Sequence, residues 1–106
     1  MITPQPQAKQ LARALGLNTE LYLKREDLHP HGSHKGRSIP IMIEIYKLVW
    51  KKFCISSSGN AALAAIYATR DDKNLSLHIF VGQHISKDKL KMIKQAIGDN
   101  KNIIIE

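Results

Sequence analysis

The sequence has one cysteine, Cys54, among 106 residues. A single cysteine cannot form a disulfide within the chain, so the fold needs no oxidising compartment and a cytoplasmic setting is expected. Because Cys54 lies in a short apolar run, residues 53–55, we expect it to be a small buried residue rather than a nucleophile.

Long hydrophobic runs are also missing. The longest apolar stretch, residues 39–50, is interrupted by Glu44 and Lys47 and falls short of the roughly 20 residues that cross a bilayer. Residues 1–9 carry two prolines and no apolar segment of the kind a signal peptide has. We therefore expect no contact with a membrane.

Aromatic residues are scarce, at 6 %, and none is interleaved with the lysine clusters, as stacking on single-stranded nucleic acid would require. The chain is nevertheless basic, with 16 Lys and Arg against 9 Asp and Glu and a net charge of +7. The lysines are spread over two expected helices, so they are interpreted as solvated faces. A basic nucleic-acid binder is a third hypothesis that rests on charge alone, and no nucleic acid is expected as a partner.

Length and composition indicate one domain over residues 1–106 with a genuine core, since 43 % of the residues are hydrophobic and 24 % are charged. Expected helices cover residues 7–15, 41–50, 61–69 and 87–97, and expected strands cover residues 21–24, 53–55, 75–81 and 103–105. Ser38 can cap the helix at 41–50, with Pro40 in its first turn, and this helix is expected to be largely buried.

Strands that alternate with helices imply right-handed crossovers. The predicted fold class is therefore three-layer α/β, a parallel sheet with helices on both faces. The chain stops just after three consecutive isoleucines at 103–105. We expect either a truncated chain or a strand that pairs with something else.

Two loops have the composition of ligand sites, residues 32–35 (GSHK) and residues 57–60 (SSGN). Each lies at the expected start of a helix and follows a strand, and ligands of open parallel sheets bind beyond the carboxyl ends of the strands. A desolvated lysine in such a place can act as an amine nucleophile. Taken separately, each loop also has an ordinary interpretation, as helix caps and as one solvated lysine of twelve.

Taken together, the motifs resemble those of fold-type II pyridoxal-phosphate (PLP) enzymes. This group is tryptophan synthase β-like and includes threonine synthase, cysteine synthase and the serine/threonine dehydratases. The motifs that carry the resemblance are TP at 3–4, LYLKREDL at 21–28, GSHKGR at 32–37 and SSGNAA at 57–62. They extend over essentially the whole chain in the order that the family has.

The resemblance implies a role for five residues. Lys35 would form the Schiff base with the PLP aldehyde and later act as the base at the substrate's α-carbon. Asn60 would hydrogen-bond the cofactor's 3′-oxygen, and Ser57, Ser58 and Gly59 would hold the carboxylate of a small amino-acid substrate. The implied activity is that of a lyase or synthase, by β-elimination or β/γ-replacement, with threonine synthase as the nearest type.

The sequence departs from the family pattern at several positions. Gly36 stands where many members have Asp, His34 where many have Phe, and Ala61 where some have Thr. The glycine-rich loop that holds the cofactor phosphate, and the residue facing the pyridine nitrogen, come later in such chains and have no counterpart here. The resemblance is therefore to the N-terminal portion only, and the expected partner is a C-terminal portion or a second copy in a homo-oligomer.

Two alternatives stay open. The chain could be a non-catalytic α/β remnant, or a separated domain, that binds an anion or a partner chain. His29, His31 and His34 could gather around a metal ion, but their spacing matches no zinc pattern and no cysteine is near, so no metal is expected.

Overall fold

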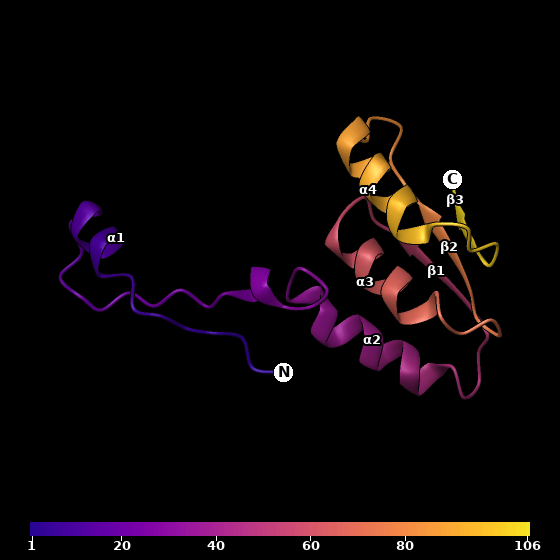
Figure 1. The fold of residues 1–106 in the computed structure, drawn as a ribbon, viewed down its shortest axis with the longest axis horizontal. Coiled ribbons are helices and arrows are strands. Elements are labelled where there is room, and N and C mark those ends of the chain that lie inside the picture. Colours follow the sequence, from indigo (N-terminus) through magenta and orange to yellow (C-terminus); the bar gives the residue numbers. More distant parts are fainter.

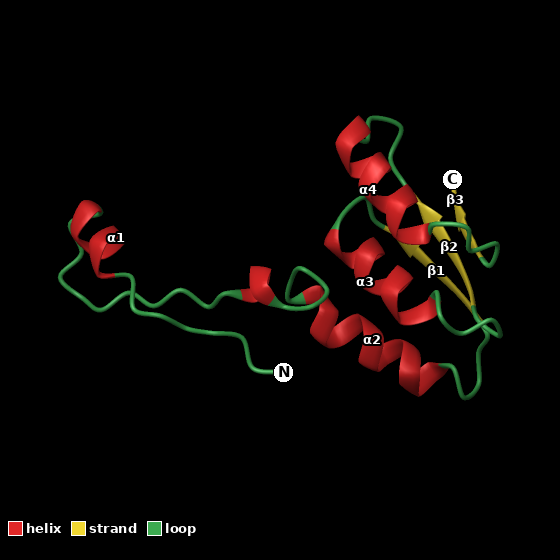
Figure 2. Ribbon diagram, viewed as in Figure 1, coloured by secondary structure: helices red, strands yellow, loops and turns green.

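The computed structural model describes all residues from 1 to 106. The elements in chain order are α1 (Lys9–Ala14), a 3₁₀ turn η1 (Glu26–Leu28), α2 (Lys35–Tyr46), β1 (Lys52–Ser56), α3 (Asn60–Thr69), β2 (Ser76–Phe80), α4 (Lys87–Ile97) and β3 (Ile103–Ile105) (Figure 1). The strands form one parallel sheet in the order β1-β2-β3, with helices packed beside it (Figure 2). The predicted α/β class with a parallel sheet is confirmed.

Local signals set the bounds of α4. Its first turn is capped by Ser86, whose side chain accepts a hydrogen bond from the Lys89 N–H at 3.3 Å. Its end is set by Gly98, which adopts φ +57°, a conformation that few other residues tolerate. The predicted helix over residues 87–97 is confirmed.

The core lies between one face of the sheet and the helices α3 and α4. Alternation along the strands buries Leu77, Ile79 and Ile103 on this face, against Ile66 of α3 and Ile93 of α4. Both crossovers advance in the same direction across the sheet, so right-handed connections place both helices on the same side. The second helical layer expected on the other face is not formed by this chain.

The opposite face of the sheet is open. Cys54 lies on this face as an exposed free thiol, so the expectation that it is buried is wrong. The physical reason is strand alternation, because Phe53 and Ile55 point to the core and the residue between them points outward.

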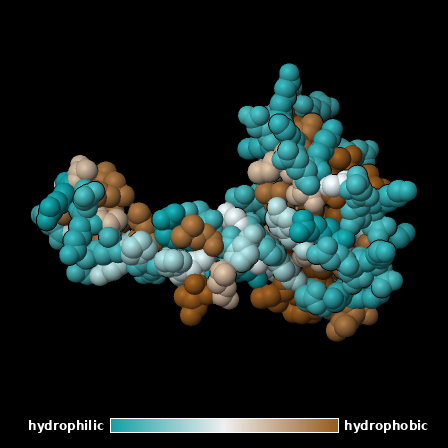
Figure 3. Space-filling model, in the orientation of Figure 1, coloured by the Kyte–Doolittle hydropathy of each residue, from teal (hydrophilic) through white to brown (hydrophobic).

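Helix α2 differs from the sequence-based prediction in position and burial. It begins at Lys35, so Ser38 and Pro40 lie inside it and Ser38 is not its cap. Only Gly36 and Ile43 are buried, because α3 is the main element that packs against α2. The α2 apolar face, as we call it, stays exposed and comprises Ile41, Met42, Ile45, Tyr46, Leu48, Val49 and Trp50. It gathers as brown side chains at the lower edge of the body in Figure 3.

Residues 1–25 form an N-terminal arm that extends away from the body and carries α1 at its far end (Figure 1). The predicted strand at 21–24 is only an isolated antiparallel bridge between Gln7 and Tyr22. Pro4 and Pro6 accept hydrogen bonds from the opposite segment but have no N–H to donate, so a longer ladder cannot form. No helix of the structure is long and apolar enough to cross a bilayer.

Candidate active site

The two loops singled out in the sequence lie at one edge of the fold. Helices α3 and α4 begin where β1 and β2 end, and α2 runs beside α3 in the same direction (Figure 1). The far ends of α2 and α3 meet, since Lys47 Nζ lies 4.0 Å from a carboxylate oxygen of Asp72. Lys35 begins α2 and Asn60 begins α3, and both helices begin on the side of the sheet at which the strands end, which we call the shared edge (Figure 1).

Lys35 is the first residue of α2 and is exposed. Its side chain takes part in no hydrogen bond and no ion pair, so the amine is available to a ligand. Its backbone N–H donates to Oγ of the buried Ser33 at 3.2 Å, which fixes the start of the helix.

The loop between β1 and α3 leaves the start of α3 uncapped. Ser57 Oγ accepts a hydrogen bond from the Gly59 N–H at 3.3 Å, and no side chain caps the helix. Leu63 is the first residue of α3 whose backbone N–H has a partner, and it donates to the Gly59 carbonyl at 3.1 Å. Three N–H groups, at residues 60–62, are therefore free to bind an anionic group. The interpretation of the serines and Asn60 as caps of this helix does not hold.

Two histidines pack against the first turn of α2. A Cβ at Gly36 would stand 2.6 Å from Nδ1 of His29 and 2.6 Å from Cβ of His31, so only glycine fits beneath them. The His31 ring lies 5.5 Å from the Tyr67 ring of α3. Desolvation lowers the pKa of His31, and the nearby charges of His29 and Arg70 lower it further. No third metal-ligating side chain joins these histidines.

Three further residues join the arm to α2 and were not recognised in the sequence as a unit: Thr3, Glu26 and Arg37. Arg37 Nε donates to Oε2 of Glu26 at 2.7 Å, and Thr3 Oγ1 donates to the same carboxylate. These hydrogen bonds, that from Arg37 above all, lower the pKa of Glu26 to about 2. The sequence carried one signal, opposite charges in the two motifs, but contact between positions 3, 26 and 37 cannot be read from spacing.

Most of the chain matches one known protein family. The family described as "Pyridoxal-phosphate dependent enzyme" matches residues 2–99. The chain belongs to this PLP-dependent family. PLP is thus the family's cofactor, and the resemblance to fold-type II enzymes is confirmed. No curated protein matches the chain.

Solved structures of PLP enzymes share the fold. A PLP-dependent aspartate racemase superposes with a TM-score of 0.78 at 18 % identity, over 100 % of this chain and 32 % of its own. Threonine deaminase isoform 2 from Solanum lycopersicum has a TM-score of 0.73 at 24 % identity, over 100 % of this chain and 28 % of its own. Maize serine racemase has a TM-score of 0.73 at 24 % identity, over 99 % of this chain and 31 % of its own. The chain spans about a third of the length of these proteins.

The side chains at the shared edge fit the family's cofactor chemically. Lys35 offers a primary amine without a partner, which can bind an aldehyde, and Asn60 offers an exposed amide with no hydrogen bond of its own. The free N–H groups of α3 suit a carboxylate. These residues could hold the reactive end of PLP and a substrate, whereas no glycine-rich phosphate loop lies within residues 1–106.

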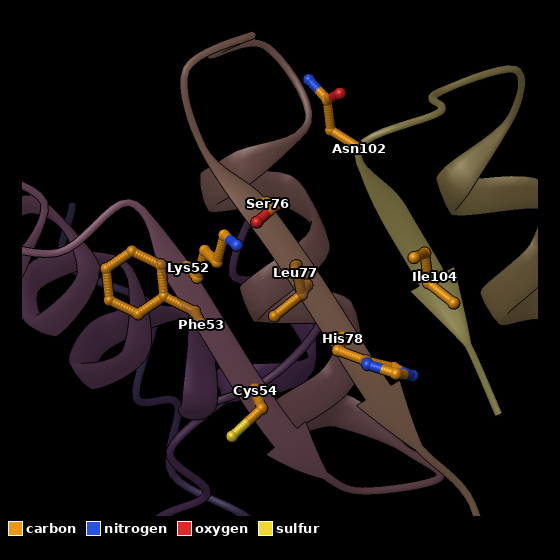
Figure 4. Close-up of a pocket in the computed structure, with 8 residues that line it drawn as sticks. All are labelled: Lys52, Phe53, Cys54, Ser76, Leu77, His78, Asn102 and Ile104. Carbon is orange, nitrogen blue, oxygen red and sulfur yellow. The ribbon is translucent and has the colours of Figure 1, made fainter.

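A separate hollow on the open face of the sheet is not part of this candidate site. It measures about 420 Å³ and is lined by Lys52, Phe53, Cys54, Ser76, Leu77, His78, Asn102 and Ile104 (Figure 4). Several of these residues come from the beginnings of the strands, whereas Lys35 and Asn60 belong to the edge where the strands end. None of the predicted site residues lines it.

Proposed function

We propose that this chain supplies the lysine and the substrate-binding loop of a PLP-dependent lyase or synthase. The enzyme acts on a small amino acid by β-elimination or β/γ-replacement, in the manner of threonine synthase. The observation that carries the proposal is the shared edge: α2 begins there with a lysine whose side chain has no partner, and α3, which packs on α2, begins there with three free N–H groups.

Each residue at the edge has a part in this proposal. Lys35 would hold the cofactor through its aldehyde carbon, and once the substrate's amino group has displaced it, the freed amine would take the proton from the substrate's α-carbon. Asn60 donates a hydrogen bond to the 3′-oxygen of the cofactor ring. The loop of Ser57, Ser58 and Gly59, with the free N–H groups that follow, binds the substrate's carboxylate. PLP, when bound, supplies the electron sink for the reaction.

The role of Lys35 can be tested by incubating the chain with limiting PLP and reducing it with borohydride. Intact mass then counts the labels, and a peptide map locates them. We expect one label, on Lys35, and its loss in Lys35→Ala. Labelling spread over the exposed lysines and unchanged in Lys35→Ala would refute the proposal.

Lys87 provides a matched control for this experiment. It is also exposed, and it is also the first residue of a helix that begins where a strand ends. Lys87→Ala should leave the labelling of Lys35 unchanged. Equal labelling of both lysines would show that any lysine at a helix start reacts, which contradicts a specific role for Lys35.

A second candidate function is that of a non-catalytic unit that binds a partner chain, and the α2 apolar face favours it. Contiguous exposed apolar surface of this kind marks protein contacts in soluble proteins. Trp50, 63 % exposed on this face, is the chain's single tryptophan and therefore reports directly on a partner. A blue shift of its emission as the chain is concentrated, with a dimer mass in sedimentation, would support homo-oligomer formation; a constant emission and a monomer mass would contradict it.

The compartment is also part of the proposal. We propose a cytoplasmic setting, which the free and exposed thiol of Cys54 supports because such a thiol persists best under reducing conditions.

A further inference from the structure

Three segments that are distant in the sequence meet at the guanidinium group of Arg37. Its Nε and Nη2 donate to the two carboxylate oxygens of Glu26 at 2.7 and 2.9 Å. Nη2 also donates to Thr3 Oγ1 at 3.2 Å, and Nη1 donates to the Met1 carbonyl at 2.9 Å. We call Thr3, Glu26 and Arg37 the clasp. It joins the start of the chain, the turn η1 and the first turn of α2.

The geometry of the clasp fixes orientation as well as distance. A guanidinium fork that meets a carboxylate with two parallel hydrogen bonds allows little rotation of either group. Thr3 is only 2 % exposed, and its carbonyl accepts a further hydrogen bond from Lys24 Nζ at 2.6 Å. The neighbouring pair Arg25–Asp27 is different, because both its side chains are exposed and it joins residues only two positions apart.

The clasp contacts α2 on the side opposite the Lys35 side chain. Lys35 and Arg37 are two residues apart in a helix, so their side chains leave the axis about 200° apart. Gly36, between them, lies beneath His29 and His31, and His31 packs on Tyr67 of α3. The first turn is thus held by the arm on one side and, through the histidines, by α3, while the amine of Lys35 stays free.

We propose that Glu26 and Arg37 are positioning residues for Lys35: the clasp sets the orientation of the first turn of α2 and thereby the direction and surroundings of the Lys35 amine. This inference rests on the function proposed above for Lys35. Neither residue needs to touch the cofactor or the substrate, because both act through the backbone of the turn.

The test compares the reactivity of Lys35 in Glu26→Gln and Arg37→Lys with that in the unaltered chain. Glu26→Gln keeps the shape of the side chain but loses its charge, and Arg37→Lys keeps the charge but loses the fork. Asp27→Asn is the matched control, since it breaks the exposed pair next to the clasp without touching α2. The readout is the rate of acetylation of Lys35 by limiting acetic anhydride, relative to Lys87, measured by peptide mass at one fixed pH.

We expect both clasp variants to change this relative rate by roughly tenfold, because the first turn of α2 then no longer holds the amine in one orientation. Asp27→Asn should change neither. The core lies between the sheet and the helices, so helix content by circular dichroism should stay the same in all three variants. A variant that loses helix content is replaced by Arg37→Ala, in which millimolar guanidinium should restore the rate seen in the unaltered chain.

An unchanged relative rate in both clasp variants would overturn the inference, and so would an equal change in Asp27→Asn. Acetylation involves no PLP, so this result is independent of the proposed function. The proposed function fails if borohydride fixes PLP elsewhere than on Lys35. The positioning role of the clasp fails if the relative acetylation rate of Lys35 does not change when the clasp is broken.

Discussion

Gly36→Ala sets two opposing effects against each other in the first turn of α2. Alanine in place of a helical glycine stabilises a helix by about 1 kcal/mol, through the lower entropy of the unfolded chain. Against this, the new Cβ would stand 2.6 Å from His29 Nδ1 and 2.6 Å from His31 Cβ. Forcing an added carbon into a filled space costs about 1–3 kcal/mol.

The identity of the neighbouring atoms decides which effect is larger. The His29 ring could rotate away, but its Nδ1 accepts a hydrogen bond from the His31 N–H at 3.2 Å, and this bond would be lost. Cβ of His31 is fixed to the backbone, so the loop itself must move. We therefore expect Gly36→Ala to lower the free energy of unfolding by up to about 2 kcal/mol.

Urea denaturation followed by circular dichroism measures this change. Ser38→Ala is the control within the same helix, because Ser38 is exposed and its replacement should stabilise the chain by a few tenths of a kcal/mol through helix propensity alone. Gly82→Ala is the control for glycine replacement, since no atom lies within 4 Å of the added carbon. A Gly36→Ala chain about 1 kcal/mol more stable than the parent would refute the reasoning, because the histidines would then not occupy that space.

Other predictions concern acid, burial and capping. The pKa of Glu26 is lowered to about 2 from an ordinary 4.5, so its contribution to stability is complete above pH 4.5 and is lost as the pH falls towards 2; Glu26→Gln should remove this step from an acid titration followed by circular dichroism. The pKa of His31 is lowered from 6.5, so the free energy of unfolding should fall as the pH drops below 6.5, and His31→Gln should flatten that slope in urea titrations. Ile66→Ala should cost about 2–5 kcal/mol in thermal unfolding because Ile66 is fully buried, whereas Ile45→Ala on the exposed side of α2 should cost less than about 0.5 kcal/mol. Ser86→Ala should cost about 1 kcal/mol by the same measurement, through loss of the helix cap.

The sequence predicted the elements whose signals are local. Ser86 and Gly98 mark the ends of α4, and the short apolar runs at residues 75–81 and 103–105 favoured strands. The position of the loop at residues 57–60 was predictable, because it follows β1 and ligand loops lie beyond the carboxyl ends of parallel strands. These features depend on residues that are neighbours in the chain or on general rules of connection. The loop at residues 32–35 follows no strand of the sheet, so its position comes from the packing of α2 on α3 and was not predictable in this way.

The features that were missed depend on which surfaces find a partner. The apolar residues of α2 predicted a buried helix, yet α3 is the main element that packs against α2 and most of these residues are exposed. Hydropathy shows that a face is apolar but not what covers it. The exposure of Cys54 follows from its position between two core residues of a strand, a pattern that a run of three residues is too short to reveal.

Some residues of the candidate site were found from local motifs, and others only from the fold. Lys35 and Asn60 were singled out from their motifs and are placed at one edge, while their roles stay predictions. The clasp needed the fold, because Thr3, Glu26 and Arg37 are brought together by the arm and by the turn before α2. No periodicity links these three positions.

The sheet has only three strands, so β1 and β3 both present a row of backbone groups without a neighbour. Such rows are templates for strand addition, and proteins protect them with charge at their ends. Here Lys51 and Lys52 stand at the start of β1, while Lys101 and Glu106 flank the three isoleucines of β3. Charge at such positions opposes edge-to-edge pairing of strands. Replacing Lys101 and Glu106 with neutral residues would leave a bare isoleucine strand, the form in which a short strand most readily recruits further copies of itself.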